Sequence, residues 1–318
     1  MTLTEEGIVH VPGMASRWVR LASGAKAHYM TSGDTGPAVV LLHGGLPGSS
    51  GTAGWRHMAP FLGANGFRVY CPDQPAFGLS DTREEYWPAG IESHVDFLHE
   101  FTTALCLDRF HLAGNSMGGI NTVNYVCAHP ERVASFVIIA ADVGDVAPGN
   151  RPEGAVPLPK IDGNAESMRA GMTAITSGTM SEELIQMRAE AAARHDQAFK
   201  AFFPSMWDYA FLQLTGDRAA RLATKGRLDR VEAPGICLYG QDDVLQPVEW
   251  GYHQEDHLPR IQFFYPADCG HQGQSDQPEL FNQVFLEFFR DGRVSGATAD
   301  AAGVSRRRPE LSDLVARP

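Results

Sequence analysis

The sequence predicts an α/β fold: a mostly parallel central sheet flanked by helices, with an inserted helical cap. Three observations carry this prediction. Apolar runs with the character of buried strands alternate with helical segments from residue 38 to residue 140, and strands return at residue 235. Strands that alternate with helices form a parallel sheet covered on both faces. Between these halves, residues 165 to about 224 show a helical pattern only.

The expected elements follow from local patterns. An opening hairpin is expected at residues 18–21 and 27–30, which flank the turn pair Ser23-Gly24. Residues 144–164 are rich in Gly and Pro and form a connection, and Ser181-Glu182-Glu183 is a good helix start before Leu184. The remaining expected elements are strands at 38–42, 67–71, 110–113, 136–140, 235–239 and 261–265, and helices at 55–62, 91–105 and 120–128.

With 318 residues, the chain is long enough for one catalytic domain with an insertion. We expect a core formed by residues 17–143 and 230–292, a helical cap at 144–229, and terminal extensions at 1–16 and 293–318. The cluster Arg306-Arg307-Arg308 in the second extension is interpreted as a solvated tail or as a subunit contact in a homo-oligomer.

The most informative motif is the run Gly114–Gly118, which fits G-x-S-x-G. A strand precedes it and a helix follows it, as in a nucleophile elbow, where a tight turn exposes the central serine. The two glycines are needed because a Cβ there would collide with the neighbouring strand or helix. The motif alone is weak evidence in a chain with 33 glycines, but its context indicates that Ser116 is a nucleophile.

The partners of such a serine are expected in the order acid, then histidine. Asp242 and Asp243 follow the strand at 235–239, and His271 follows the strand at 261–265. Both positions lie at the carboxyl edge of a parallel sheet, where sites collect. Taken singly, a solvated loop and a surface histidine would explain them. Taken together and in this order, they predict a base that accepts the serine proton and a carboxylate that holds its imidazole.

A glycine-rich loop, His43–Gly48, directly follows the strand at 38–42. Such a loop leaves backbone N–H groups open to a developing negative oxygen. We expect the N–H groups of Gly45 and of Met117, the residue after the nucleophile, to form an oxyanion hole. The alternative is an ordinary glycine turn.

Composition excludes several classes of function. The net charge of −12 argues against nucleic acid or an anionic membrane surface as partner. The five cysteines are scattered without metal-type spacing, and Cys127 and Cys237 lie in apolar segments, which favours buried free thiols. No signal peptide is visible, and the apolar run Val133–Ala141 is too short to span a bilayer. We expect a cytoplasmic protein without metal or cofactor.

The motifs at residues 42–48, 114–119, 240–243 and 269–271 together resemble those of the α/β-hydrolase superfamily. Within it the chain resembles the meta-cleavage-product hydrolases, which split C–C bonds in the degradation of aromatic compounds, from about residue 17 to 292. The resemblance implies that the acid is Asp243 rather than Asp242, since the family's acid stands three residues after the glycine that ends the strand.

The same resemblance implies two substrate contacts, and Gln272, where the chain departs from the family, is a third candidate contact. Arg188, in a segment like the family's cap arginine, would bind the substrate carboxylate through its planar fork; a surface arginine is the alternative. Asn115 would position the polar end of the substrate, or has a local role in the turn. Two residues depart from the family: Gln272 stands where a tryptophan usually follows the histidine, and Leu46 replaces a glycine. Both departures fall where the substrate lies.

These features predict a serine hydrolase that cleaves the C–C bond of a 2-hydroxy-6-oxo-dienoate. The alternative is a carboxylesterase for a monoester of an aromatic dicarboxylic acid, such as a monoalkyl phthalate. In both, the partner is a small carboxylate. A third class is a non-catalytic ligand receptor on the same fold, but such proteins usually lose a triad member, and all three candidates are present here.

Overall fold

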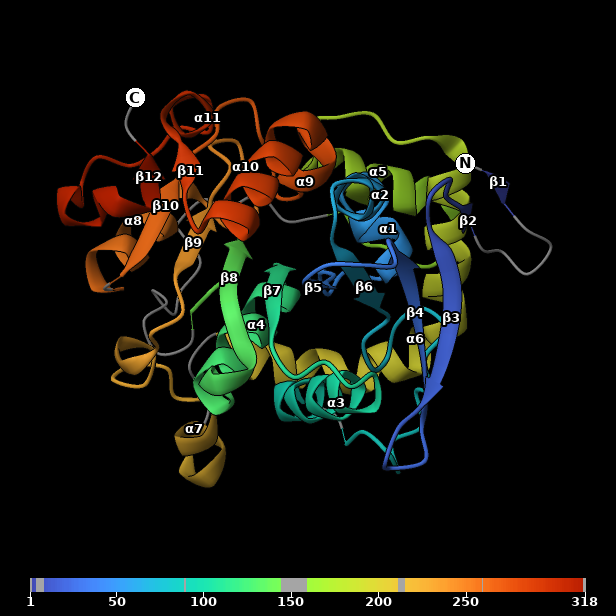
Figure 1. Ribbon diagram of the computed structural model, residues 1–318. Coiled ribbons are helices and arrows are strands. Elements are labelled where there is room, and N and C mark those ends of the chain that lie inside the picture. The colour runs from blue at the N-terminus through green and yellow to red at the C-terminus, as the bar shows by residue number, and fades with distance from the viewer. Residues whose placement is uncertain are drawn as a thin grey trace.

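An eight-stranded, mostly parallel sheet forms the centre of the computed structural model, which describes residues 2–3, 9–88, 90–143, 159–210, 215–258 and 260–316 (Figure 1). Its strand order is β10-β9-β8-β7-β5-β6-β4-β3, and only β3 and β4 run antiparallel to their neighbours. The strands are β3 (Ala15–Arg20), β4 (Lys26–Ser32), β5 (Ala38–Leu42), β6 (Arg68–Pro72), β7 (Phe110–Asn115), β8 (Val133–Ile139), β9 (Gly235–Leu238) and β10 (Ile261–Phe264). The predicted fold class is confirmed.

Helices connect successive parallel strands, as the alternation in the sequence predicts. Helices α1 (Gly51–Trp55) and α2 (Met58–Ala64) join β5 to β6, α3 (Ile91–Ala104) joins β6 to β7, α4 (Met117–Ala128) joins β7 to β8, and α8 (Val248–His257) joins β9 to β10. After β10 come α9 (Gly273–Asp276), α10 (Pro278–Asp291) and α11 (Gly296–Ala301), and short 3-10 turns lie at Pro130–Arg132, Leu228–Arg230 and Pro309–Leu314. The single helix expected at 55–62 is wrong, since it is two helices. Pro60 has no N–H for the carbonyl of Arg56 and its ring would clash there, so one continuous helix cannot form.

Side chains that alternate along β5 build the two hydrophobic cores, one on each face of the sheet. Val40 and Leu42 pack in the core that includes residues of α3 and α4. Val39 and Leu41 pack in the core that includes residues of α1, α2 and α10. All five residues of this strand are buried. A strand covered on both faces reads as a continuous apolar run, which is why this segment was recognisable in the sequence.

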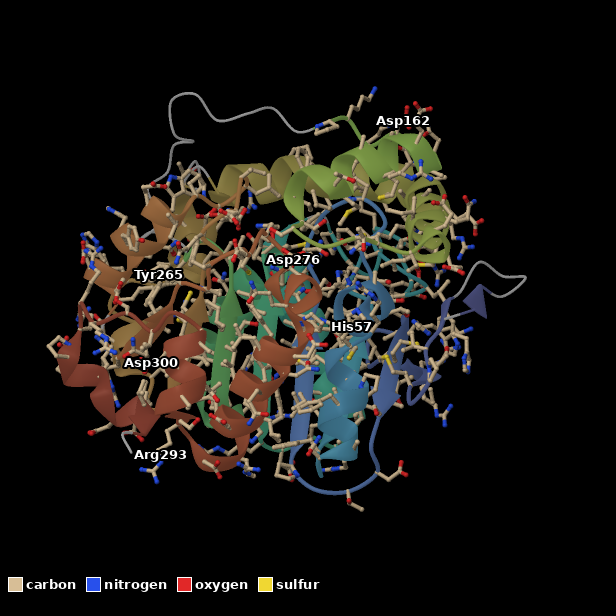
Figure 2. All side chains as sticks on the ribbon, turned by 90° about the horizontal axis from the view of Figure 1, so that it is seen from above. His57, Asp162, Tyr265, Asp276, Arg293 and Asp300 are labelled. Atoms are coloured by element: carbon tan, nitrogen blue, oxygen red, sulfur yellow. The ribbon has the colours of Figure 1, made fainter. Side chains whose placement is uncertain are left out.

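Between β8 and β9 the chain leaves the sheet and forms α5 (Ala165–Ile175), α6 (Glu182–Ala210) and α7 (Gly216–Leu222). The expected connection at 144–158 lies outside the described residues. The helices α5 and α6 share a small apolar core of their own, formed by Met168, Met172, Ile175, Ile185, Ala189 and Ala192. One contact of the cap with the main body is the N–H of Gly178, which donates to the carboxylate of Asp276 at 3.3 Å. Asp276, labelled in Figure 2, is the last residue of α9.

The C-terminal segment folds back onto the core, which corrects its interpretation as a solvated tail. Val294 of β11 (Val294–Ser295) is fully buried beside β12 (Val315–Ala316). Arg307 forms an ion pair with Asp256 of α8 (2.5 Å), and Arg308 donates to the carbonyl of Glu255 (2.8 Å). Two members of the arginine cluster therefore attach the segment to α8.

None of the five cysteines, all of which lie in the described part of the chain, forms a disulfide. Cys237 is buried as expected, whereas Cys127 is only partly buried, because it lies beside the exposed Ala128 at the end of α4. In the described part of the chain, no helix is both long and apolar enough to cross a membrane. A short antiparallel pair, β1 (Thr2–Leu3) with β2 (Val9–His10), precedes the sheet.

Candidate active site

Ser116 occupies the turn between β7 and α4 in a strained backbone conformation. Its φ is 54° and its ψ is −122°, values that a residue with a side chain rarely adopts. The backbone N–H of Ser116 donates to the carbonyl of Ile139 on the neighbouring strand at 2.8 Å, which fixes the turn. The serine is only partly buried, although Asn115 and Met117 on either side of it are buried. The turn thus presents this one side chain.

The two motif glycines make the turn sterically feasible. A Cβ on Gly114 would lie 2.0 Å from the carbonyl oxygen of Gly118, and a Cβ on Gly118 would lie 2.2 Å from that of Leu42. Both distances are far below any van der Waals contact, so a side chain at either place would force the strand and the helix apart. The collision with the neighbouring strand or helix that the sequence predicts for a Cβ at these two positions is therefore found in the structure.

His271 and Asp243 form a buried, hydrogen-bonded pair. The Nδ1 of His271 lies 2.8 Å from the Oδ2 of Asp243, and both side chains are almost completely buried. The Oδ1 of Asp243 accepts two backbone N–H groups, from Leu245 at 2.8 Å and from Gln246 at 2.9 Å. Asp242 is exposed instead, and the carboxylate that meets the imidazole is that of Asp243.

The second nitrogen of His271 is available for chemistry. Its Nε2 is buried and has no hydrogen-bond partner in the described part of the structure. The loop of His271 is held against the serine turn, since the Asn115 side chain donates to the His271 carbonyl at 2.9 Å. The His271 N–H also donates to Ile175, the last residue of cap helix α5, at 2.8 Å. Hydrogen bonds to a nucleophile are often loose in a free enzyme and tighten when the substrate binds.

The glycine-rich loop lies beside the serine turn because β5 and β7 are neighbouring parallel strands with Leu42 opposite Gly114. A Cβ on Gly44 would lie 3.4 Å from the Cβ of Ser116. Gly45 comes next and is buried, and Met117 is the first residue of α4, where backbone N–H groups lack helical partners. Gly45 and Met117 therefore both lie close in sequence to residues that meet at the nucleophile, and their role as an oxyanion hole stays a prediction.

His43 holds this loop in place. Its Nδ1 lies 2.8 Å from the carbonyl of Gly44, and its Nε2 accepts the N–H of Gln74 at 3.0 Å. Burial lowers the pKa of His43 to about 4 despite the nearby carboxylate of Asp73. The ring is neutral at pH 7, as one donating and one accepting nitrogen require. Sequence reasoning missed this role, although a histidine at the end of a buried strand was a visible signal.

Arg188 of α6 reaches the same site from the cap. A Cβ on Gly48 would lie 2.1 Å from the carbonyl oxygen of Arg188, so the cap helix packs directly on the glycine-rich loop. The Arg188 side chain is buried, and one Nη donates to the Oε1 of Gln272 at 3.4 Å. Because Gln272 follows His271, this guanidinium lies next to the histidine loop.

Asn115 has a different environment from the one expected. Its amide nitrogen donates to the carbonyls of His271 (2.9 Å) and Ile139 (3.3 Å), and its side chain is buried. In the structure Asn115 therefore joins the serine turn to the histidine loop, and its substrate contact is left as a hypothesis.

Asp142 is a buried carboxylate near the triad that the sequence analysis overlooked. It follows β8 by three residues, its Oδ2 accepts the Gln246 amide at 3.1 Å, and its Oδ1 has no partner in the described structure. Burial raises the pKa of Asp142 to about 6, and the charge of Asp243 adds to the rise while His271 opposes it. The position of an acid just past a buried strand led to the prediction of Asp243, and the same criterion would have identified Asp142.

Two cavities are lined in part by residues of α6. One of about 370 Å³ is lined in part by His94 and Phe202, and one of about 300 Å³ in part by Pro47 and Gly48. They share Ala76 and His195, and no triad residue lines either. In the described residues, no group of three or more His, Cys, Asp or Glu side chains is arranged to hold a metal ion.

Comparisons with known proteins agree with this fold. Residues 37–278 match the family model described as alpha/beta hydrolase fold. A 2-hydroxy-6-oxononadienedioate/2-hydroxy-6-oxononatrienedioate hydrolase of Paraburkholderia phymatum is 29% identical, over 88% of this chain and 98% of that protein. A 2-hydroxy-6-oxo-6-phenylhexa-2,4-dienoate hydrolase of Burkholderia cepacia is 28% identical, over 83% and 91%. The solved structure of such a phenylhexadienoate hydrolase from Rhodococcus is similar, with a TM-score of 0.72, 25% identity, and coverage of 87% and 99%.

Proposed function

The chain belongs to the α/β-hydrolase fold family, and on that premise we propose that it is a serine hydrolase that cleaves the C–C bond of a 2-hydroxy-6-oxo-dienoate. Such dienoates are the meta-cleavage products of aromatic-compound catabolism. The observation that carries the proposal is the buried guanidinium of Arg188 beside the histidine loop. The names of the relatives from Paraburkholderia and Burkholderia, which are hydrolases of such dienoates, support it.

Arg188 lacks the partner that a buried cation needs. Its Nε and one Nη are buried without a hydrogen-bond partner, and no carboxylate of the described residues lies within ion-pair distance. Burial, followed by the positive charge of Arg56, lowers the pKa of Arg188 to about 9, so it is still a cation at pH 7. A buried, unpaired charge is costly, and an anionic ligand would remove that cost. A substrate carboxylate, with two oxygens for the planar fork, fits this requirement.

The chemistry that we propose places the carboxylate end of the dienoate on Arg188. The substrate first ketonises: the 2-hydroxyl group loses its proton and C5 gains one. Ser116 then attacks the C6 carbonyl while His271 takes its proton, and Asp243 stabilises the imidazolium. The N–H groups of Gly45 and Met117 stabilise the oxyanion.

Collapse of the oxyanion breaks the bond between C5 and C6. The electron pair moves onto the fragment that bears the Arg188-bound carboxylate, and the proton from His271 completes it as a 2-hydroxy-dienoate. Water then hydrolyses the acyl group on Ser116 and releases the second carboxylic acid. The anchored fragment can accept this electron pair because its 2-oxo group is conjugated with the breaking bond.

A second candidate is the hydrolysis of a monoester of an aromatic dicarboxylic acid, and one observation favours it. Gln272 is buried and presents its amide toward Arg188, which makes the wall beside His271 polar. A polar wall suits an ester or a carboxylate better than an aryl or alkenyl group. Arg188 would again hold the free carboxylate, and Ser116 would form an ordinary acyl-enzyme.

Replacement of Arg188 by Ala tests the carboxylate contact. We expect catalysis on carboxylate-bearing substrates to weaken by ~1.5–3 kcal/mol, the range for charge-assisted hydrogen bonds. Neutral nitrophenyl esters of short acids should be hydrolysed almost as before, because they make no such bond. Steady-state kinetics on both substrate types is the measurement, with the exposed Arg194 of the same helix replaced by Ala as control. An equal loss on both types would show that Arg188 only supports the cap.

The ratio of two kcat/KM values separates the two candidate reactions. We expect the purified protein to act on a 6-aryl dienoate better than on a monoalkyl phthalate, because the loop, the elbow and the Arg188 segment all resemble the dienoate hydrolases. Loss of dienoate absorbance and release of the alcohol are the two readouts. A ratio well below one, with rapid alcohol release, would replace the C–C hydrolase by the monoester carboxylesterase.

A further inference from the structure

Ser16, His28 and Asp73 form a second serine–histidine–aspartate chain outside the candidate active site. The Oγ of Ser16 lies 2.8 Å from the Nε2 of His28, and the Nδ1 of His28 lies 2.7 Å from the Oδ2 of Asp73. His28 and Asp73 are both 1% exposed, whereas Ser16 is exposed to solvent. None of these residues takes part in the mechanism proposed above.

The sheet register brings the three residues together. On β3 and β4, Trp18 lies opposite His28 and Ser16 opposite Met30, so Ser16 and His28 are diagonal neighbours on one face. On the next strand pair, Tyr29 lies opposite Pro72, and the N–H of Asp73 donates to the carbonyl of His28 at 3.0 Å. The pairing of β3, β4 and β6 therefore fixes the positions of the three hydrogen-bonded residues. Strand β3 is the outermost strand of the sheet.

The hydrogen-bond directions are those that activate a serine. Asp73 accepts the N–H of Gly51 on Oδ1 at 2.7 Å and the N–H of Leu79 on Oδ2 at 2.9 Å. Burial raises the pKa of Asp73, but the interactions with His28 and His43 and the hydrogen bond from Gly51 together outweigh burial and hold that pKa below its usual value. The ionised carboxylate can only accept, so Nδ1 of His28 carries a proton, and in the neutral ring Nε2 accepts the hydrogen bond of the Ser16 hydroxyl.

The surroundings of Ser16 offer a place for a small aryl ester. Trp18 is 49% exposed, and its ring lies 4.9 Å from that of His28. The ammonium of Lys26 lies 5.3 Å from the Trp18 ring, and the guanidinium of Arg17 donates to the carbonyl of Ser16. The exposed Trp18 ring, with Lys26 over it, thus lies on the same side of the sheet as the Ser16 hydroxyl. Unlike Ser116, Ser16 lies in a regular strand rather than in a tight turn before a helix, which makes its reactions slower.

We propose that Ser16 is a second acyl-acceptor serine, activated by His28 and Asp73, that reacts with activated aryl esters of short acids. In this step a bond forms between the Oγ of Ser16 and the carbonyl carbon, and the bond from that carbon to the aryloxide breaks. The Oγ proton moves to the Nε2 of His28 and then to the aryloxide, which leaves as the phenol. The product is an acyl-Ser16 ester on the surface of the sheet edge.

The test uses the full chain with Ser116 replaced by Ala, so that the candidate active site contributes no acyl-enzyme. The protein is incubated with p-nitrophenyl acetate, and acetylated peptides are quantified by mass spectrometry over time. Ser23, an exposed serine in the turn between the same two strands, is the internal reference. We expect the peptide with Ser16 to be acetylated at least ten times faster than the one with Ser23.

Two further variants in the Ser116→Ala background make the result specific. Ser16→Ala, a change at an exposed position, should remove the fast fraction of p-nitrophenol release. His28→Gln should lower the acetylation rate of Ser16 to that of Ser23, with circular dichroism as the check on folding. Acetylation of Ser16 at the rate of Ser23 in the Ser116→Ala protein would overturn the proposal. So would nitrophenol release that is unchanged by Ser16→Ala.

Discussion

Replacement of Ser116 by Ala is expected to lower kcat by a factor on the order of 10³ or more, while the protein remains folded. The reason is that the proposed mechanism has no other group at the elbow that can form the acyl intermediate. Folding should persist because Ala keeps the Cβ, and with it the same backbone strain at φ 54°. The hydroxyl is not what holds the turn; the N–H bond to Ile139 does that.

The measurement is steady-state turnover of a dienoate or an aryl ester, with the thermal midpoint as the check on folding. Ser23→Ala, at an exposed turn far along the chain from the elbow, is the matched control and should change neither quantity. Turnover within about tenfold of the parent would remove Ser116 from the mechanism, because tenfold corresponds to only ~1.4 kcal/mol of transition-state stabilisation. A nucleophile supplies far more than that.

The serine turn was the part of the site that could be read from the sequence. The need for glycine follows from nearby backbone. A Cβ on Gly114 would clash with the carbonyl of Gly118, and a Cβ on Gly118 would clash with that of Leu42 on the neighbouring strand. The parallel sheet was equally readable, because buried strands leave continuous apolar runs such as 38–42. Residues placed at strand ends, such as Asp243 and His271, then meet because the sheet edge brings them together.

What the sequence did not predict depends on contacts between distant segments. For Asn115 the sequence suggested a substrate contact or a local role in the turn, and neither reading foresaw its hydrogen bond to a carbonyl 156 residues away. Asp142 was passed over because the sequence that follows it is rich in Gly and Pro and shows no periodic pattern. The cluster Arg306–Arg308 was interpreted as a solvated tail or a subunit contact, since nothing local in the sequence shows that Arg307 and Arg308 bind Asp256 and Glu255 of α8. A contact between residues far apart in the sequence produces no periodic pattern of residue types from which it could be predicted.

The second large effect on kcat is expected at Asp243, and Asp242 is its matched control. The two residues are adjacent, and replacement of either by Asn removes one negative charge. Asp243→Asn is expected to lower kcat on the order of 10³-fold or more, whereas Asp242→Asn should stay within about threefold. Asp242 is exposed, and substitutions at such positions usually have small effects. Steady-state kinetics of the two variants, with folding checked by circular dichroism, gives the ranking.

The structure supplies the reason for the large loss. One oxygen of Asp243 accepts the N–H groups of Leu245 and Gln246, and the other faces the Nδ1 of His271. In the Asn variant, the amide oxygen must stay on the two N–H groups, which turns the NH₂ group toward His271. That donor forces the proton from Nδ1 to Nε2, and Nε2 can then no longer accept the proton of Ser116. A severe defect in Asp242→Asn together with a mild one in Asp243→Asn would contradict this arrangement. A mild defect in both would point to Asp142, the other buried carboxylate near His271, as the acid.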